Sequence, residues 1–99
     1  MSPKSNYLNF LKLNEKKLNT PDVKIVTAFY KFFEVSDTVA LQNSLKSIFN
    51  KTEIKGTILI AKEGVNGTIA GTKNEITIAL EKLWCLDFLI DLEPKYSFA

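Results

Sequence analysis

Apolar and polar residues alternate along the chain in patterns that predict four strands. Residues 24–33 (Lys-Ile-Val-Thr-Ala-Phe-Tyr-Lys-Phe-Phe) are rich in β-branched and aromatic side chains without a helical period, which is typical of a central strand. Residues 54–61 predict a second strand and residues 68–70 a short third one. Residues 89–98 alternate between apolar positions, Ile90 among them, and polar ones, which predicts a half-buried strand whose proline favours an edge.

Two segments between these strands have the period of amphipathic helices. An apolar stripe runs through residues 41–49, and the Ser-Asp pair at 36–37 can cap the N-terminus, so we expect a helix that ends near Lys51. Residues 72–75 (Thr-Lys-Asn-Glu) have the spacing of a capping box. A second amphipathic helix is therefore expected to run from here to about Trp84.

The segment between the second and third expected strands predicts a hairpin. Asn66-Gly67 is the dipeptide typical of a type I′ turn, because both positions tolerate a positive φ. Gly64 would also permit a longer, bulged loop over residues 62–67. The two strands should therefore pair antiparallel, with the turn at residues 66–67.

The order of these elements, β-α-β-β-α-β, predicts an α+β chain with a ferredoxin-like fold: an antiparallel sheet with two helices on one face. The other face of the sheet is left open. Residues 23–99 form this domain, and residues 1–22 are an N-terminal extension with a loose helical stripe. We expect the extension to be either a short helix packed on the domain or a disordered segment.

The amino-acid composition excludes several kinds of catalytic and metal-binding site. The 99 residues include no His, no Arg and only Cys85, which excludes His-based nucleophilic catalysis, a Cys/His metal site and an intrachain disulfide. We expect Cys85 to be a semi-buried structural thiol. No apolar run reaches the roughly 18–20 residues of a membrane span, so a soluble chain without a membrane partner is expected.

Two activities known for this topology, acyl-phosphate hydrolysis and RNA recognition, are not supported by the charged and aromatic residues of the chain. The net charge is +2, but the excess lies in residues 1–20, and the remainder is slightly acidic. Acylphosphatases need a loop arginine to hold an acyl phosphate, so that activity is excluded. RNA-recognition modules carry aromatic side chains on both central strands. Because the expected third strand has none, we assign the aromatic residues of 24–33 to the core.

The loop at residues 62–68 is the candidate binding site. Glu63, Asn66 and Thr68 would present a carboxylate, an amide and a hydroxyl from one hairpin, while Gly64 and Gly67 would allow close backbone approach. Two nearby cations, Lys31 and Lys62, complete the set of expected substrate-binding residues. No residue of the chain is expected to be catalytic or to bind a metal. The alternative explanation of the glycine pattern is a well-formed hairpin turn.

Residues 55–71 (Lys-Gly-Thr-Ile-Leu-Ile-Ala-Lys-Glu-Gly-Val-Asn-Gly-Thr-Ile-Ala-Gly), together with 26–33 and 96–99, resemble the N-terminal acylphosphatase-like domain of the bacterial rhodanese-domain tRNA uridine hydroxylases. The resemblance covers about residues 23–99. It implies oxygen-dependent hydroxylation of the wobble uridine of tRNA at C5, with tRNA as the partner.

In that family the reactive cysteine lies in a downstream rhodanese domain, and Cys85 does not match it. The resemblance therefore implies that this chain is a first domain that positions substrate, holds no cofactor of its own and works with a rhodanese domain in cis. Two alternatives remain open: a non-enzymatic interaction or dimerisation module that uses the open sheet face, and a small-ligand binder that uses residues 63–68.

Overall fold

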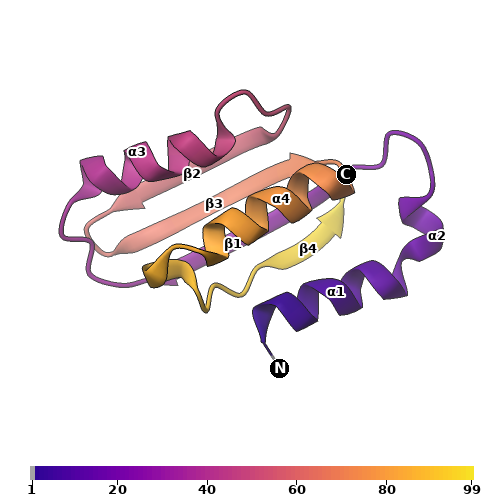
Figure 1. The fold of residues 1–99 in the computed structure, drawn as a ribbon, viewed down its shortest axis with the longest axis horizontal. Helices are drawn as coiled ribbons and strands as arrows, with labels where there is room; N and C mark the ends of the chain where they lie inside the picture. The colour runs from indigo at the N-terminus through magenta and orange to yellow at the C-terminus, as the bar shows by residue number, and fades with distance from the viewer. Residues whose placement is uncertain (1) are drawn as a thin grey trace.

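A four-stranded antiparallel sheet in the order β2-β3-β1-β4 forms one layer of the molecule. The computed structural model describes residues 2–99 (Figure 1). Its elements are α1 (Pro3–Leu13), α2 (Glu15–Leu18), β1 (Ile25–Phe32), α3 (Thr38–Phe49), β2 (Lys55–Ala61), β3 (Gly64–Gly71), α4 (Lys73–Trp84), the 3-10 helix η1 (Asp87–Leu89) and β4 (Lys95–Phe98).

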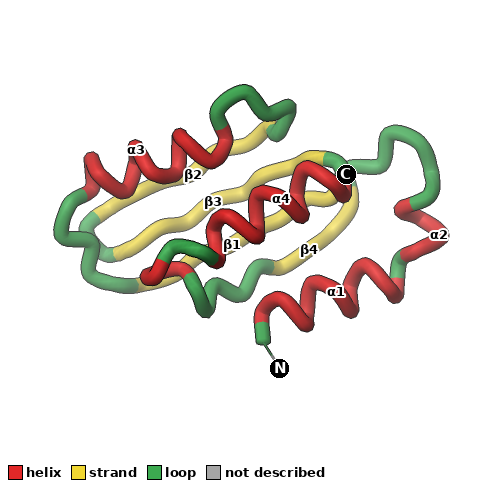
Figure 2. The backbone as a smooth tube through the Cα atoms, in the orientation of Figure 1, coloured by secondary structure: helices red, strands yellow, loops and turns green. Residues whose placement is uncertain are grey.

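Helices α3 and α4 cover one face of this sheet, as Figures 1 and 2 show, with α3 over β2 and α4 over β3 and β1. Alternate residues of the two central strands, Phe29 on β1 and Val65 and Ile69 on β3, are buried beneath them. The expected α+β, ferredoxin-like fold is confirmed.

Both long helices of the core begin at side chains that the sequence pattern indicates. The Asp37 carboxylate accepts a hydrogen bond from the Ala40 amide at 3.0 Å and caps α3. At α4 the Thr72 hydroxyl accepts from the Glu75 amide at 3.3 Å, and the Glu75 carboxylate accepts from the Thr72 amide at 2.9 Å. This complete capping box fixes the direction in which the chain leaves β3.

The N-terminal segment is helical, and α1 lies along β4 beside α4 (Figure 1). Tyr7 is only 2% exposed, and its ring packs against Trp84 of α4 and Tyr96 of β4. Phe10 stacks on Phe98 with ring centroids 5.4 Å apart. These contacts extend the core under β4, so α1 forms a third helix on the covered face of the sheet.

The hairpin turn lies at residues 62–63 and not at the expected 66–67. Gly64 pairs with Ala61, and Asn66 and Gly67 lie inside β3, which is eight residues long. In this register Ile60 is opposite Val65, so both apolar side chains share the covered face. A turn at 66–67 would instead place Val65 opposite Thr68 and bury a hydroxyl with it, which costs free energy.

The last strand is shorter than expected, because residues 87–92 form η1 and a second tight turn. The Leu89 amide donates to the Leu86 carbonyl oxygen at 2.8 Å, and the Leu92 amide donates to the Leu89 carbonyl oxygen at 3.0 Å. This three-residue spacing buries both Leu89 and Leu92 and leaves Ile90 exposed, which corrects the expected strand alternation. β4 starts only after Pro94, at Lys95.

Cys85 ends α4 and is exposed, which corrects the expectation of a semi-buried thiol. It is the C-cap residue, so its side chain lies beyond the apolar stripe of the helix. Within residues 2–99, no helix combines the length and the apolar character that crossing a bilayer requires.

Candidate functional site

The turn that joins β2 to β3 is fixed by backbone hydrogen bonds to the segment after β1. The carbonyl oxygen of Glu63 accepts from the Phe33 amide at 2.9 Å, and that of Lys62 accepts from the Val35 amide at 2.9 Å. The Lys62 and Glu63 side chains are both exposed. This end of the sheet therefore presents a cation and a carboxylate on a rigid turn.

Two of the expected site residues, Gly64 and Gly67, allow close packing. Gly64 has a φ of +147°, and a Cβ at this position would lie 2.0 Å from the carbonyl oxygen of Lys31. Gly67 faces the helices, and a Cβ there would come within 2.9 Å of the Phe29 ring and 3.0 Å of Ile58. Neither glycine is needed for a turn, so the function of both is to let neighbouring groups approach.

Asn66 and Thr68 are exposed on the open face of the sheet, opposite the helices. In the strand register Asn66 lies between Leu59 of β2 and Tyr30 of β1. Thr68 lies in the adjacent row, between Thr57 and Ala28. The structure thus brings these two side chains together on one surface, with the turn residues at its end.

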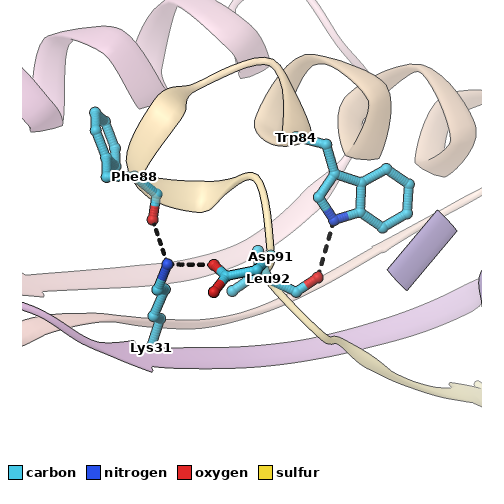
Figure 3. Close-up of polar contacts among 5 residues, drawn as sticks. All are labelled: Lys31, Trp84, Phe88, Asp91 and Leu92. Atoms are coloured by element: carbon cyan, nitrogen blue, oxygen red, sulfur yellow. Dashed lines mark hydrogen bonds and ion pairs between the residues drawn. The ribbon is translucent and has the colours of Figure 1, made fainter. Parts of the chain in front are cut away.

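Lys31 points to the opposite face of the sheet, as Figure 3 shows. Its ammonium group donates to the Phe88 carbonyl oxygen at 2.8 Å and forms an ion pair with the Asp91 carboxylate. The hydrogen bond from Lys31, with the attraction of its charge, lowers the pKa of Asp91 below its usual value. Lys31 is therefore separated from Asn66 and Thr68 by the sheet itself.

The contacts of Lys31 hold the segment between α4 and β4 in place. The Trp84 indole nitrogen adds a second anchor by donating to the Leu92 carbonyl oxygen at 2.9 Å (Figure 3). Together these bonds satisfy two carbonyl groups that the 3-10 turns leave without a partner. The segment is fixed on the covered side of the sheet, where it does not obstruct the open face.

The exposed aromatic side chains Tyr30 and Phe32 were missed by the sequence analysis, which assigned the aromatic residues of this strand to the core. Tyr30 is 66% exposed and Phe32 is 80% exposed, whereas Phe29, the residue before Tyr30, is buried. The two exposed rings lie on the open face with centroids 5.6 Å apart and planes at 62°. The period of two along a strand places Tyr30 and Phe32 on one face and Phe29 on the other, but it does not show which face meets solvent.

Small residues surround the aromatic pair, so the open face contains a shallow depression around the two rings. Gly64 and Ala61 lie in line with Phe32 across the sheet, and Ala28 lies beside Tyr30 along β1. These residues line one continuous depression, together with Asn66 and Thr68. The two rings therefore project from a shallow surface of small residues, where a planar ligand could contact them.

Charged side chains border the depression. Lys95 lies in the row of Thr68 and Ala28, on β4, and Lys55 begins β2 one row further on. Glu63 lies at the turn, and the Glu93 carboxylate accepts a hydrogen bond from the Asn6 side-chain amide of α1. Two lysines thus border the end of the face that lies away from the turn.

Residues 24–99 match the family described as the UPF0176 acylphosphatase-like domain. The chain belongs to this family. A tRNA uridine(34) hydroxylase from Prochlorococcus marinus (strain NATL1A) is 43% identical over 75 residues, which are 74% of this chain and 24% of that protein. The chain therefore spans about a quarter of the length of this relative, and α1 and α2 lie outside the family match.

The surface of this UPF0176 domain is suited to binding. Within the described residues 2–99, no three His, Cys, Asp or Glu side chains lie close enough together to hold a metal ion. The open face offers π-systems, an amide, a hydroxyl and ammonium groups, which can stack on, hydrogen-bond to and neutralise a ligand. These groups have no role in the core of the domain.

Proposed function

We propose that this chain is the N-terminal, substrate-positioning domain of a tRNA uridine hydroxylase and contributes no catalytic residue. In this proposal the complete enzyme hydroxylates the wobble uridine of tRNA at C5, in an oxygen-dependent reaction in the cytoplasm. A downstream rhodanese domain would supply the reactive cysteine. The observation that carries the proposal is the 43% identity to a protein named tRNA uridine(34) hydroxylase across nearly the whole domain.

The proposed tRNA contacts are the exposed groups at the turn and on the open face. Lys62 would approach a phosphate, and Asn66 and Thr68 would hydrogen-bond to sugar or base. Glu63 would accept a hydrogen bond from a hydroxyl or an exocyclic amino group. Gly64 and Gly67 would act through the backbone geometry, and Lys31 would act indirectly by holding the segment after α4.

Removing the gene and measuring its tRNA product tests this proposal. We expect deletion of the complete coding sequence to abolish the C5-hydroxylated wobble uridine and the nucleosides derived from it, detected by mass spectrometry of digested tRNA. Complementation with the whole gene should restore them. Complementation with a gene that lacks codons 24–99 should not. An unchanged level of modified nucleoside in the deletion strain, with no second pathway present, would contradict the proposal.

An interaction or dimerisation module is the second candidate, favoured by the exposed apolar side chains of the open face. Leu59 is 62% exposed and lies in the same row as Tyr30. Two copies could cover these side chains by packing face to face. Light scattering on the 99-residue chain over a range of concentrations tests self-association, since a monomer at high concentration rules out dimerisation through this face.

A further inference from the structure

The open face carries an arrangement of side chains that core packing and strand stability do not explain. Tyr30 and Phe32 lie on a central strand, yet both rings are turned to solvent, which leaves a large apolar area exposed. Within the described part of the chain these are the two aromatic residues among the exposed large hydrophobic side chains. Such a pair on an otherwise flat surface indicates a ligand that covers it.

The geometry of the pair suits two planar groups. With ring planes at 62° and centroids 5.6 Å apart, each ring presents a face of its own. The neighbouring residues Ala28, Ala61 and Gly64 leave space above the sheet on both sides. A planar group can therefore stack on either ring without meeting a bulky neighbour.

The polar groups around the pair argue against an apolar partner. The Asn66 amide lies directly between Leu59 and Tyr30 in the strand register. A hydrophobic protein surface packed here would bury this amide without hydrogen bonds, at a cost of about 1–3 kcal/mol. A nucleobase avoids that cost, because it offers a π-face to the ring and a polar edge to the amide at the same time.

The charges beside the face suit a polyanion that crosses the strands. Lys95 is one row from Tyr30, and Lys55 is one row beyond that, so both lysines lie on the same side of the aromatic pair, on the two edge strands. The carboxylates of Glu93, which accepts a hydrogen bond from Asn6, and of Glu63 also line the depression. A strand whose bases stack on the rings can thus place its following phosphates near the lysines.

We infer that the open face binds single-stranded RNA, with two unpaired bases stacked on Tyr30 and Phe32, the Asn66 amide on a base edge and Lys95 and Lys55 at the phosphates. Unpaired bases are required, because the faces of paired bases are covered by their neighbours in the helix. The inference rests on the proposed function for its substrate, tRNA, and specifies which part of that RNA the domain would contact: a loop, not a stem.

Fluorescence anisotropy with three labelled RNAs tests the inference on the 99-residue chain: a single-stranded heptauridylate, a blunt RNA duplex and an unmodified tRNA transcript. Tyr30→Ala/Phe32→Ala should weaken binding of the heptamer at least tenfold, since stacking contributes about 1–3 kcal/mol per base. The matched control, Val39→Ala/Ile78→Ala, removes exposed apolar groups from α3 and α4 and should leave affinity unchanged. Tyr30→Phe/Phe32→Tyr keeps both rings and should retain affinity.

The outcomes separate this inference from the proposed function. If the wild type binds tRNA and the heptamer and Tyr30→Ala/Phe32→Ala binds both equally well, the stacking inference is wrong while the proposed function stands. If the wild type binds no RNA, the inference is wrong, and the proposed function is decided separately by the level of modified nucleoside in the deletion strain. If the double variant abolishes a dimer seen by light scattering and keeps wild-type RNA affinity, the face binds a second copy instead, and the inference is overturned.

Discussion

The hydroxyl groups of Tyr7 and Thr77 lie 2.6 Å apart and join α1 to α4 by a hydrogen bond. Tyr7 is outside the region that matches the family, and Thr77 is inside it. Burial raises the pKa of Tyr7 above its usual value, because the interior disfavours the phenolate. The N-terminal helix is thereby attached to the domain through a specific polar contact as well as through apolar packing.

Substitutions at Tyr7 should separate these two contributions. Tyr7→Phe removes only the hydrogen bond and should lower the free energy of unfolding by about 1 kcal/mol. Tyr7→Ala also leaves a cavity beside Trp84 and Tyr96 and should cost about 3–5 kcal/mol. Urea denaturation monitored by Trp84 fluorescence measures both. Equal stability of Tyr7→Ala and the wild type would show that α1 does not pack on the domain in solution.

Acid should weaken the capping box of α4. The hydrogen bond from the Thr72 backbone amide lowers the pKa of Glu75 in the folded state below its usual value. The carboxylate therefore stabilises the fold fully above the usual pKa of a glutamate, and this contribution is lost as the pH falls through the lowered pKa. The free energy of unfolding, measured from pH 7 to pH 2, should fall more for the wild type than for Glu75→Gln. Parallel curves would contradict this assignment.

Gly64→Ala should be strongly destabilising. The new Cβ would meet the Lys31 carbonyl oxygen, and the φ of +147° is unfavourable for any residue with a side chain. We expect a loss of more than about 1 kcal/mol of folding free energy. Gly71→Ala is the matched control, because its Cβ would meet only side chains at 3.1 Å or more. Thermal unfolding of both variants checks the prediction, which fails if the two lose the same stability.

Lys62→Glu should weaken tRNA affinity and reduce its dependence on salt. A lysine that contacts one phosphate contributes about one unit to the slope of log affinity against log salt concentration. Lys82→Glu makes the same change of charge on α4, away from the open face, and should leave the slope nearly unchanged. Binding titrations at several salt concentrations provide the measurement. Equal slopes for the wild type and Lys62→Glu would remove Lys62 from the proposed site.

Local signals in the sequence were sufficient for most elements of the fold. Thr72 and Glu75 predict the start of α4 because a capping box needs only residues within one helical turn. The β-branched and aromatic run of β1 predicts its strand for the same reason, since side-chain crowding acts locally. The order of the elements then restricts the topology to the ferredoxin-like arrangement that the structure has.

The features that the sequence analysis missed depend on contacts between distant segments. Asn66-Gly67 favours a turn locally, but the pairing of Ile60 with Val65 decides the register and places the turn earlier. Ile90 fits a strand alternation, yet burial of Leu89 and Leu92 three residues apart produces tight turns. Apolar residues on both faces of β1 also hide which of them meets solvent.

Adjacent residues of β1 lie on opposite faces of the sheet: Phe29 is buried in the core, and Tyr30 is exposed on the open face. An insertion or deletion of a single residue within this strand would exchange the two roles for every position that follows it. Relatives of this domain should therefore vary in length only in the loops, or by two residues at a time within strands. Insertions are expected to collect around Lys51, between α3 and β2, where no strand pairing fixes the number of residues.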